Sequence, residues 1–226
     1  MSSPFHNSLF HFLLSRKENL ISSHVAIMGG VSGSRFAFED KLFDLPLVIF
    51  DFETTGLDTR TAKIIEIGAI KYLGRKEVAR FSELIDPKEN VSEEITRITG
   101  IDNSMLVGKP SIQEILPKFH DFLRGCVGFA HNAEFDVGML HHESYRLGIS
   151  CDYTIFCSLK MARSLVKIER RNLDALAAHY GLTFESRHRS IGDILVTAGV
   201  LWRMIDENPE LQTIADFSSY REPMLG

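Results

Sequence analysis

The sequence IFDFETTGL, residues 49–57, carries two acidic side chains in an apolar setting. Residues 45–50 form an apolar run with β-branched and aromatic members, bracketed by a proline and a Thr-Thr-Gly turn, and this pattern predicts a buried β-strand. Because side chains alternate between the two faces of a strand, Asp51 and Glu53 point in the same direction. This strand organises the interpretation of the remaining sequence.

Two neighbouring carboxylates on an apolar strand repel each other, and burying an unpaired charge costs several kcal/mol. No Lys or Arg lies within residues 45–57, so a divalent metal ion is the simplest cation that could neutralise the two carboxylates. Carboxylate oxygens favour Mg²⁺ or Mn²⁺. The alternative is a strand that ends at Phe50, with both acids facing water in a turn, and the two acids alone leave that alternative open.

Composition indicates a globular protein with one substantial core, because the 226 residues are 44% hydrophobic and 24% charged. The net charge of −5 argues against a protein that coats nucleic acid by bulk electrostatics, although a local basic groove is compatible with it. Three cysteines without a Cys-x-x-Cys pair favour reduced thiols and a cytoplasmic protein. The apolar piece at residues 9–14 is too short to cross a membrane, and we expect no membrane association.

Residues 1–44 differ in sequence pattern from residues 45–226, and we interpret them as an N-terminal extension. Phe5, Leu9, Phe12 and Leu13 have helical spacing, which predicts a short amphipathic helix, and the Gly- and Ser-rich residues 28–34 predict a flexible linker. Residues 45–226 form the main domain in this interpretation. We expect the extension to pack on that domain, to dock a protein partner or to stay mobile.

The order of expected elements indicates an α/β protein in which the sheet comes first and the helices later. Three strands separated by short turns predict an antiparallel meander, and the later strand–helix pair predicts a parallel crossover. The expected strands are 45–50, 62–72, 78–85, 127–131 and 153–157. The expected helices are 92–98, 111–124, 132–145, 158–167, 172–180, 190–206 and 209–219.

Three further polar residues are candidates for the same site. Asp136 lies in the first turn of a helix for which Asn132 is a good N-cap, just beyond a strand, where α/β proteins place ligands. His188 and Asp193 frame the beginning of the long helix near residue 190. Each has a structural alternative: Asp136 complements the helix dipole, Asp193 caps with Ser190, and His188 is solvated.

The ordered motifs FDFETTGL at 50–57, ITGI at 98–101, HNAEFD at 131–136, and His188 followed after four residues by Asp193 resemble the DEDDh class of 3′ to 5′ exonucleases. Its best-known member is the proofreading epsilon subunit of bacterial DNA polymerase III. The resemblance spans residues 46–206. It implies a ribonuclease H-like mixed sheet, with three antiparallel strands and then parallel strands, flanked by helices.

The resemblance also implies roles for individual residues. Four acids correspond to the metal site, namely Asp51, Glu53, Asp136 and Asp193. His188 corresponds to the histidine that activates water. The residues that correspond to contacts with the 3′-terminal nucleotide are Thr54, Leu57 and Ile101, and Asn132 corresponds to one near its phosphate.

The implied chemistry is phosphodiester hydrolysis with two divalent ions, Mg²⁺ or Mn²⁺, about 3.5–4 Å apart, which clamp the attacking and leaving oxygens. Asp51 would bridge the ions, Glu53 and Asp193 would complete the nucleophile side, and Asp136 the leaving-group side. His188 would accept the proton of the attacking water, giving 5′-mononucleotides. Basic side chains would line the path of the strand or form a solvated face, and they include Lys160, Arg163, Lys167, Arg170, Arg171, Arg187 and Arg189.

Our leading interpretation is a 3′ to 5′ exonuclease for single-stranded DNA ends, in proofreading or repair. An exoribonuclease that trims RNA 3′ ends is the alternative, because no residue in the sequence indicates whether the site binds or excludes a 2′-hydroxyl. A non-catalytic nucleic-acid-binding module and a two-carboxylate glycosidase fit less well. The short chain after the last expected helix leaves no long tail of the kind that tethers epsilon to its polymerase. A stand-alone repair or nucleotide-recycling exonuclease, or one whose protein partner binds residues 1–44, fits the sequence as well as a dedicated replisome enzyme.

Overall fold

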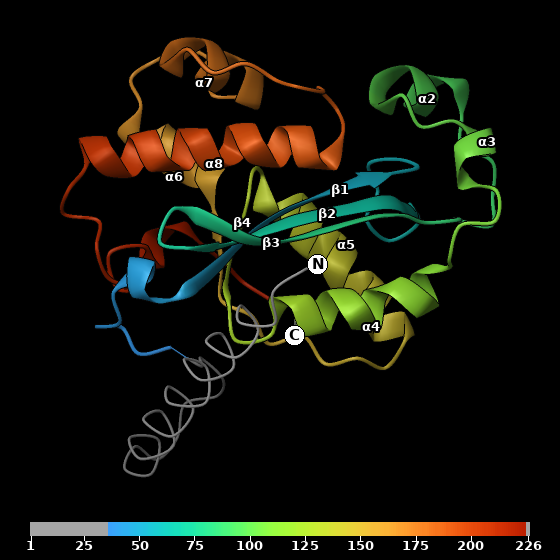
Figure 1. The fold of residues 1–226 in the computed structure, drawn as a ribbon, viewed down its shortest axis with the longest axis horizontal. Helices are drawn as coiled ribbons and strands as arrows, with labels where there is room; N and C mark the ends of the chain where they lie inside the picture. Colours follow the sequence, from blue (N-terminus) through green and yellow to red (C-terminus); the bar gives the residue numbers. More distant parts are fainter. Residues whose placement is uncertain (1–35, 225–226) are drawn as a thin grey trace, which may run out of the picture. The chain divides into compact units, whose positions relative to one another are not determined.

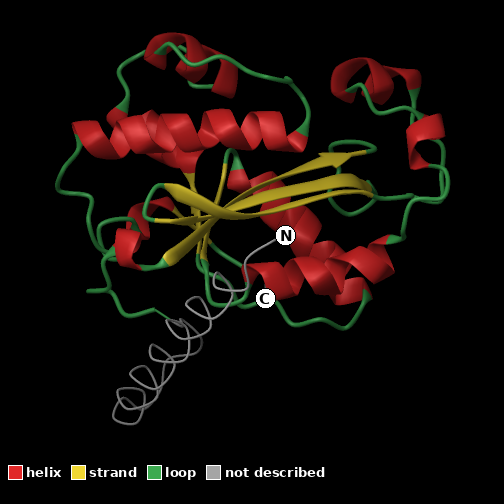
Figure 2. Cartoon of the chain, viewed as in Figure 1, coloured by secondary structure: helices red, strands yellow, loops and turns green. Residues whose placement is uncertain are grey.

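The computed structural model of the protein describes residues 36–224. The short helix and flexible linker expected within residues 1–35 lie outside these residues. A twisted sheet lies between two layers of helices (Figures 1 and 2). No helix among residues 36–224 combines the length and the apolar character that crossing a membrane requires.

The sheet has six strands among the described residues, in the order β3-β2-β1-β4-β5-β6. The first three strands form the antiparallel meander, β4 and β5 run parallel to β1, and the short β6 is antiparallel to β5. The predicted mixed sheet is confirmed, and β6 was not predicted. The strands are β1 (Pro46–Thr54), β2 (Ile64–Leu73), β3 (Lys76–Leu84), β4 (Val127–Ala130), β5 (Ile155–Cys157) and β6 (Arg221–Glu222).

Strand β1 occupies a central position in the sheet, between β2 and β4. It pairs with β2 along its whole length, but with β4 only through residues 47–49. The strand continues through Asp51 and Glu53 as far as Thr54. The alternative in which the strand ends at Phe50 and the acids face water in a turn is therefore wrong.

Helices cover both faces of the sheet (Figure 1). Helices α6, α7 and α8 lie on one side, and α4 and α5 on the other. The helices are α2 (Glu93–Thr99), α3 (Asn103–Leu106), α4 (Ile112–Leu123), α5 (Ala133–Arg146), α6 (Ser158–Leu165), α7 (Leu173–Tyr180) and α8 (Ser190–Glu207), with 3₁₀ turns η1 (Leu42–Asp44) and η2 (Ser218–Tyr220). The helices expected between residues 92 and 206 are thus confirmed, and the short α3 was not predicted.

The helix predicted at residues 209–219 is wrong. Pro209 lies just after the end of α8, Thr213 forms an isolated β-bridge with Lys41, and residues 214–217 form turns that lead into η2. The carboxylate of Asp216 accepts hydrogen bonds from the backbone amides of Gln212 and Thr213, at 3.0 and 2.7 Å. These side-chain bonds satisfy backbone donors locally and compete with helical hydrogen bonding.

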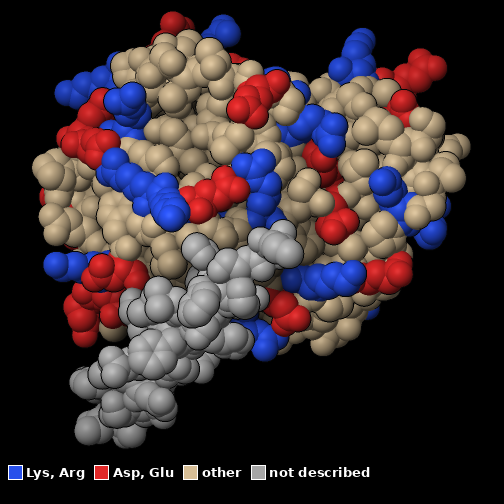
Figure 3. Space-filling view, viewed as in Figure 1, with Lys and Arg blue, Asp and Glu red and all other residues tan. Residues whose placement is uncertain are grey.

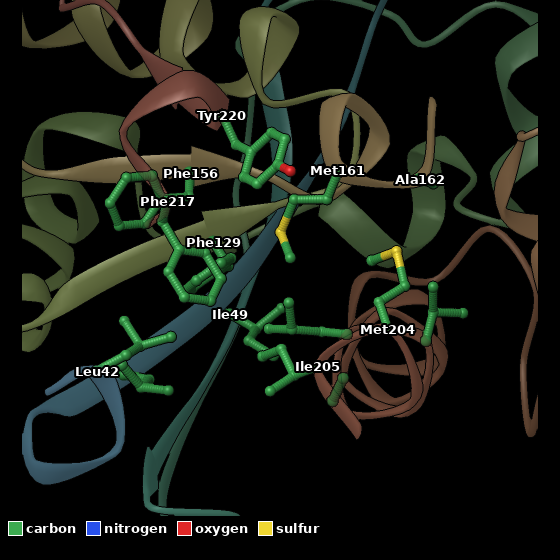
Figure 4. Packing of buried hydrophobic residues seen from close by; sticks show 14 of the residues in the cluster. Leu42, Ile49, Phe129, Phe156, Met161, Ala162, Met204, Ile205, Phe217 and Tyr220 are labelled. Carbon is green, nitrogen blue, oxygen red and sulfur yellow. The ribbon is translucent and has the colours of Figure 1, made fainter. Parts of the chain in front are cut away.

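The sheet separates the two larger clusters of the hydrophobic core, and a third, smaller cluster contains Ile65 and Ile101. Figure 4 shows the cluster on the α8 side, in which Ile49 of β1, Phe129 of β4 and Met204 of α8 pack together. Leu42, from the segment before β1, lies in the same cluster and is fully buried. This packing holds α8 against β1 and β2, and so brings the two ends of the predicted site together.

All three cysteines are free thiols, and Cys126 and Cys157 are buried.

Candidate active site

Three carboxylates form a compact group where β1 meets the beginning of α8. Ligand oxygens of Asp51, Glu53 and Asp193 all lie within 4.8 Å of one another. Asp51 and Glu53 come from alternate positions of β1, whereas Asp193 lies in the first turn of α8. The predicted association of these three residues is therefore present in the structure, although some 140 positions separate them in the chain.

Burial and mutual repulsion raise the pKa values of all three acids, and the nearby guanidinium of Arg187 offsets this only in part. Burial, and after it the charges of Asp136, Glu53 and Asp193, raise the pKa of Asp51 well above its usual range. Burial and the charges of Asp193 and Glu66 raise the pKa of Glu53 to about 8. Burial likewise raises the pKa of Asp193, against the opposing charge of Arg187.

These three oxygen donors suit a hard divalent cation such as Mg²⁺ or Mn²⁺. A cation bound there would replace the protons that the raised pKa values retain and would relieve the repulsion between the carboxylates. The residues present thus fit a divalent metal ion, with Asp51, Glu53 and Asp193 as its ligands.

The fourth predicted acid, Asp136, is attached directly to β1. Its Oδ1 accepts a hydrogen bond of 3.1 Å from the backbone amide of Phe52, the residue between Asp51 and Glu53. Asp136 is almost fully buried, and burial raises its pKa to about 8 although this hydrogen bond opposes the shift. The structure therefore brings Asp136 to the site, beside the group of three acids rather than within it. Its part in holding a leaving-group-side ion stays a prediction.

The segment before α8 contacts Asp193 in two ways. The guanidinium of Arg187 donates to the Asp193 carboxylate and, at 2.8 and 3.1 Å, to Asp174 of α7. The backbone amide of His188 donates to Asp193 Oδ1 at 3.3 Å. The alternative in which Ser190 and Asp193 form a cap is wrong, because Arg189 occupies the N-cap position and no side chain there makes a cap hydrogen bond.

His188 lies at a strained position beside this group. Its φ of 57° is in the left-handed region, which costs a non-glycine residue about 1–3 kcal/mol. Its ring Nδ1 lies 3.3 Å from Nη1 of Arg187, and the side chain is half-buried. Tight packing maintains this backbone, since a Cβ on Gly192 would lie only 1.8 Å from the carbonyl oxygen of Ser186. Its role as the base stays a prediction.

The four residues predicted to contact substrate differ in what they expose. Leu57 is 87% exposed and Asn132 is also exposed, so both are accessible to a ligand. Thr54 is buried and donates to the carbonyl of Gly56 at 2.7 Å, which shapes the turn after β1. Ile101 is fully buried in a cluster with Ile65, Val91 and Leu106. Their contacts with a nucleotide stay predictions.

Asn132 does not act as the side-chain cap that the sequence predicts. It occupies the N-cap position of α5, but its φ of 62° is left-handed and its side chain makes no cap hydrogen bond. The chain turns so sharply between β4 and α5 that this residue adopts a conformation in which asparagine is enriched. The result is an exposed asparagine on the short connection that leads to Asp136.

Sequence reasoning missed Glu66, a buried acid of β2. Glu66 pairs across the sheet with Glu53 and binds the side chain of Arg189. Like Asp51, Glu66 is an acid within an apolar strand segment, residues 64–70, and this pattern could have identified it as a candidate site residue. Two basic residues expected to line a nucleic-acid path, Arg187 and Arg189, instead form ion pairs with acids around the site.

Comparison with known proteins gives a consistent result. The family model RNase_T, described as exonuclease, matches residues 48–201. The DNA polymerase III PolC-type protein of Clostridium perfringens is 36% identical over 187 residues, which cover 82% of this chain and 13% of that protein. The PolC-type protein of Thermotoga maritima is 38% identical over 170 residues, covering 74% and 12% respectively. The chain thus spans about an eighth of the length of these relatives.

Solved structures share the architecture. Exonuclease X in complex with 5′ overhanging duplex DNA superposes with a TM-score of 0.61 at 26% identity, covering 75% of this chain and 99% of that one. E. coli exonuclease I in complex with a dT13 oligonucleotide has a TM-score of 0.66 at 15% identity, covering 74% and 42%. The likeness to exonuclease I shows the common fold.

Proposed function

The chain belongs to the RNase_T exonuclease family, which confirms the family resemblance of its motifs, and we propose that it is a metal-dependent 3′ to 5′ exonuclease for single-stranded DNA ends. The observation that carries this proposal is the convergence of Asp51, Glu53 and Asp193, with oxygens within 4.8 Å of one another. Its products would be 5′-mononucleotides, released in proofreading or repair.

The acids supply the binding part of the mechanism. Asp51, Glu53, Asp193 and Asp136 would hold two divalent ions, Mg²⁺ or Mn²⁺, which when bound polarise the phosphate and lower the pKa of water. Asp136 is already oriented by the amide of Phe52, so this carboxylate loses little further freedom on binding.

The loop before α8 supplies the proton transfer. His188 would accept the proton of the attacking water, because a neutral imidazole is the commonest general base in proteins. Its backbone amide is hydrogen-bonded to Asp193, so the base is positioned relative to a metal ligand. In the turn after β1, the exposed Leu57 offers an apolar surface on which a terminal base can stack.

The relatives support DNA as the polymer. The structures of exonuclease X and exonuclease I contain DNA, and the similar PolC-type proteins are DNA polymerases. On the face shown in Figure 3, basic and acidic side chains are interspersed. Among the described residues, the face shown therefore carries no broad basic surface of the kind that binds nucleic acid by bulk electrostatics.

We further propose a cytoplasmic protein, which the three free thiols support. A protein partner that binds residues 1–44 remains part of this proposal.

The test is a time course on a 5′-end-labelled single-stranded DNA and the matching RNA, with Mg²⁺ or Mn²⁺ and with EDTA. We expect a metal-dependent ladder that shortens from the 3′ end, faster on DNA. Faster loss of RNA would identify an exoribonuclease. Immediate release of a labelled mononucleotide would contradict the proposed polarity. Intact DNA and RNA, with metal binding demonstrated by calorimetry, would instead indicate a nucleic-acid-binding module.

A further inference from the structure

Glu66 is a buried carboxylate that lies next to the three-carboxylate group without belonging to it. It is directly opposite Glu53 in the antiparallel pairing of β1 and β2. Both of its oxygens are engaged elsewhere: Oε1 accepts from Nη2 and Nε of Arg189 at 2.6 and 3.1 Å, and Oε2 accepts from the backbone amide of Ser190 at 2.9 Å. Glu66 is therefore committed to the beginning of α8.

The bond to Ser190 makes Glu66 an external cap for this helix. Ser190 is the first residue of α8, and the first amides of a helix have no partner within it. Arg189, at the N-cap position, makes no side-chain cap hydrogen bond. A carboxylate from β2 takes over that role, and its charge complements the positive end of the helix dipole.

Close packing fixes the contact between β2 and α8. A Cβ on Gly68 would lie 2.3 Å from Oγ and 2.6 Å from Cβ of Ser190, so a residue with a side chain at position 68 would force α8 away. Gly68 and Glu66 lie on the same face of β2, because side chains alternate along a strand. The helix therefore contacts β2 at two successive inward positions.

The geometry extends this contact to the catalytic groups. Asp193 lies three residues after Ser190, within the same helical turn, and His188 lies one residue before Arg189. Glu53 is on the neighbouring strand, about 4.8 Å away in the direction of the hydrogen bonds. The Glu66–Arg189 pair therefore lies beside the β1 acids, at the beginning of the α8 segment that completes the site.

The pair is also neutral as a whole. Of the ion pairs among residues 36–224, the Glu66–Arg189 pair has the most buried acid, whose side chain is 3% exposed. Without Arg189, Glu66 would add an uncompensated negative charge beside four other carboxylates. The Arg189 side chain is 37% exposed, so the buried member of the pair is the acid, and removing Arg189 would leave that buried charge without its partner.

We propose that Glu66 and Arg189 are positioning residues, which hold Asp193 and His188 in register with Asp51 and Glu53 while touching neither metal nor substrate. This inference rests on the proposed exonuclease function. Residues of this kind orient metal ligands, and their loss typically lowers metal affinity or activity about 10–100-fold.

The experiment uses the full chain with Glu66→Gln, Arg189→Met and the double variant. Glu66→Gln keeps an acceptor for Ser190, whereas Arg189→Met keeps the aliphatic stem but leaves Glu66 unpaired. Arg75→Met is the matched control, because it removes the exposed Arg75–Asp206 pair near the other end of α8. The readouts are the Kd for Mn²⁺ by calorimetry, and kcat and KM on single-stranded DNA.

We expect Arg189→Met to weaken Mn²⁺ binding by about 10-fold or more and to lower kcat by a similar factor, with KM nearly unchanged. The double variant should recover part of both losses, because it removes the unpaired charge. Arg75→Met should match the wild type. Wild-type Mn²⁺ affinity in Arg189→Met, or losses in the double variant that equal the product of the single losses, would overturn the proposal.

The proposal stays testable even if one variant does not fold or the wild type is inactive. If Arg189→Met does not fold, the neutral double variant still tests whether the pair sets Mn²⁺ affinity, and wild-type affinity in it would overturn the proposal. If the wild type degrades neither DNA nor RNA, the proposed function fails, but the calorimetric comparison still tests the positioning role.

Discussion

The backbone amide of Phe52 donates a hydrogen bond of 3.1 Å to Oδ1 of Asp136. Phe52 stands between the two acids of β1, beyond residue 49, where the pairing of β1 with β4 ends. The first turn of α5 thus supplies the acceptor for a strand amide that β4 does not reach. This contact attaches α5, in addition to β2 and α8, to the stretch of β1 that carries Asp51 and Glu53.

Replacing Asp136 separates its hydrogen bond from its charge. Asp136→Asn keeps an acceptor for Phe52 and avoids both the burial of a charge and the uptake of a proton on folding, so in EDTA we expect the variant to be at least as stable as the wild type. Asp136→Ala leaves the amide without that partner and should cost about 1–3 kcal/mol of unfolding free energy. Urea unfolding at neutral pH measures both variants. Equal stability of the Ala and Asn variants would show that the hydrogen bond is not important.

The acidic site predicts an unusual pH dependence of stability in EDTA. Glu53 and Asp136 have pKa values of about 8 in the folded chain, against ordinary values of 4.5 and 3.8. Between these limits the folded state binds more protons than the unfolded state, so the free energy of unfolding falls as pH rises. Melting temperatures in EDTA should therefore decrease from about pH 5 to about pH 8.

Saturating Mn²⁺ should flatten or reverse this trend, because the ion stabilises the deprotonated carboxylates and binds more tightly as they lose protons. The increase in melting temperature caused by Mn²⁺ should thus be larger at pH 8 than at pH 5. Glu53→Gln should show a weaker pH dependence in EDTA than the wild type. An increase caused by Mn²⁺ that is the same at both pH values would contradict this account of the site.

Gly192 tests the packing that positions His188. A Cβ at this position would lie 1.8 Å from a backbone oxygen, so Gly192→Ala must displace residues 186–189. We expect weaker Mn²⁺ binding and a loss of about 1–3 kcal/mol in stability. The matched control is Gly199→Ala on the same helix, whose Cβ would meet only the end of the Leu182 side chain, at 2.8 Å.

Gly199→Ala should leave the Kd for Mn²⁺ unchanged, because Leu182 can rotate and alanine favours the helix by about 1 kcal/mol. Calorimetry with Mn²⁺ compares the two variants directly. If both alanine variants bind Mn²⁺ as the wild type does, the loop before α8 does not control the metal site.

His188→Ala separates catalysis from metal binding. If His188 accepts the proton of water, its loss should slow the chemical step by about 10²–10⁴-fold while the Kd for Mn²⁺ changes little. His179→Ala is the control, since His179 is exposed on α7. Single-turnover rates on DNA measure the step. If His188→Ala cleaves DNA as fast as the control, His188 is a solvated side chain and is not the catalytic base.

The sequence predicted the parts of the site that follow from local periodicity. Asp51 and Glu53 share a face because a strand repeats every two residues, and the structure confirms that arrangement. The approach of Asp193 to them followed from motif resemblance, since no local pattern links positions 140 residues apart. The contact between Asp136 and Phe52 depends on where β4 stops pairing, which a single sequence does not specify.

The wrong and missed predictions have a common physical origin, which is that local sequence patterns do not specify the hydrogen-bond partners of the residues involved. Asp216 holds turns where a helix was predicted, and Asn132 takes a left-handed conformation where a side-chain cap was predicted. Glu66 was overlooked because its partners, Arg189 and Ser190, come from more than 120 positions away. Such contacts depend on tertiary structure, and propensity alone does not reveal them.

In the proposed function, the group around Asp193 catalyses metal-dependent removal of nucleotides from 3′ ends. The most direct measurement compares wild type and Asp193→Asn in one Mg²⁺-started time course on 5′-end-labelled single-stranded DNA, with melting in EDTA as the check on folding. We predict a 3′-shortening ladder for the wild type and none for a fully folded Asp193→Asn. A folded Asp193→Asn that degrades DNA at the wild-type rate would contradict the account.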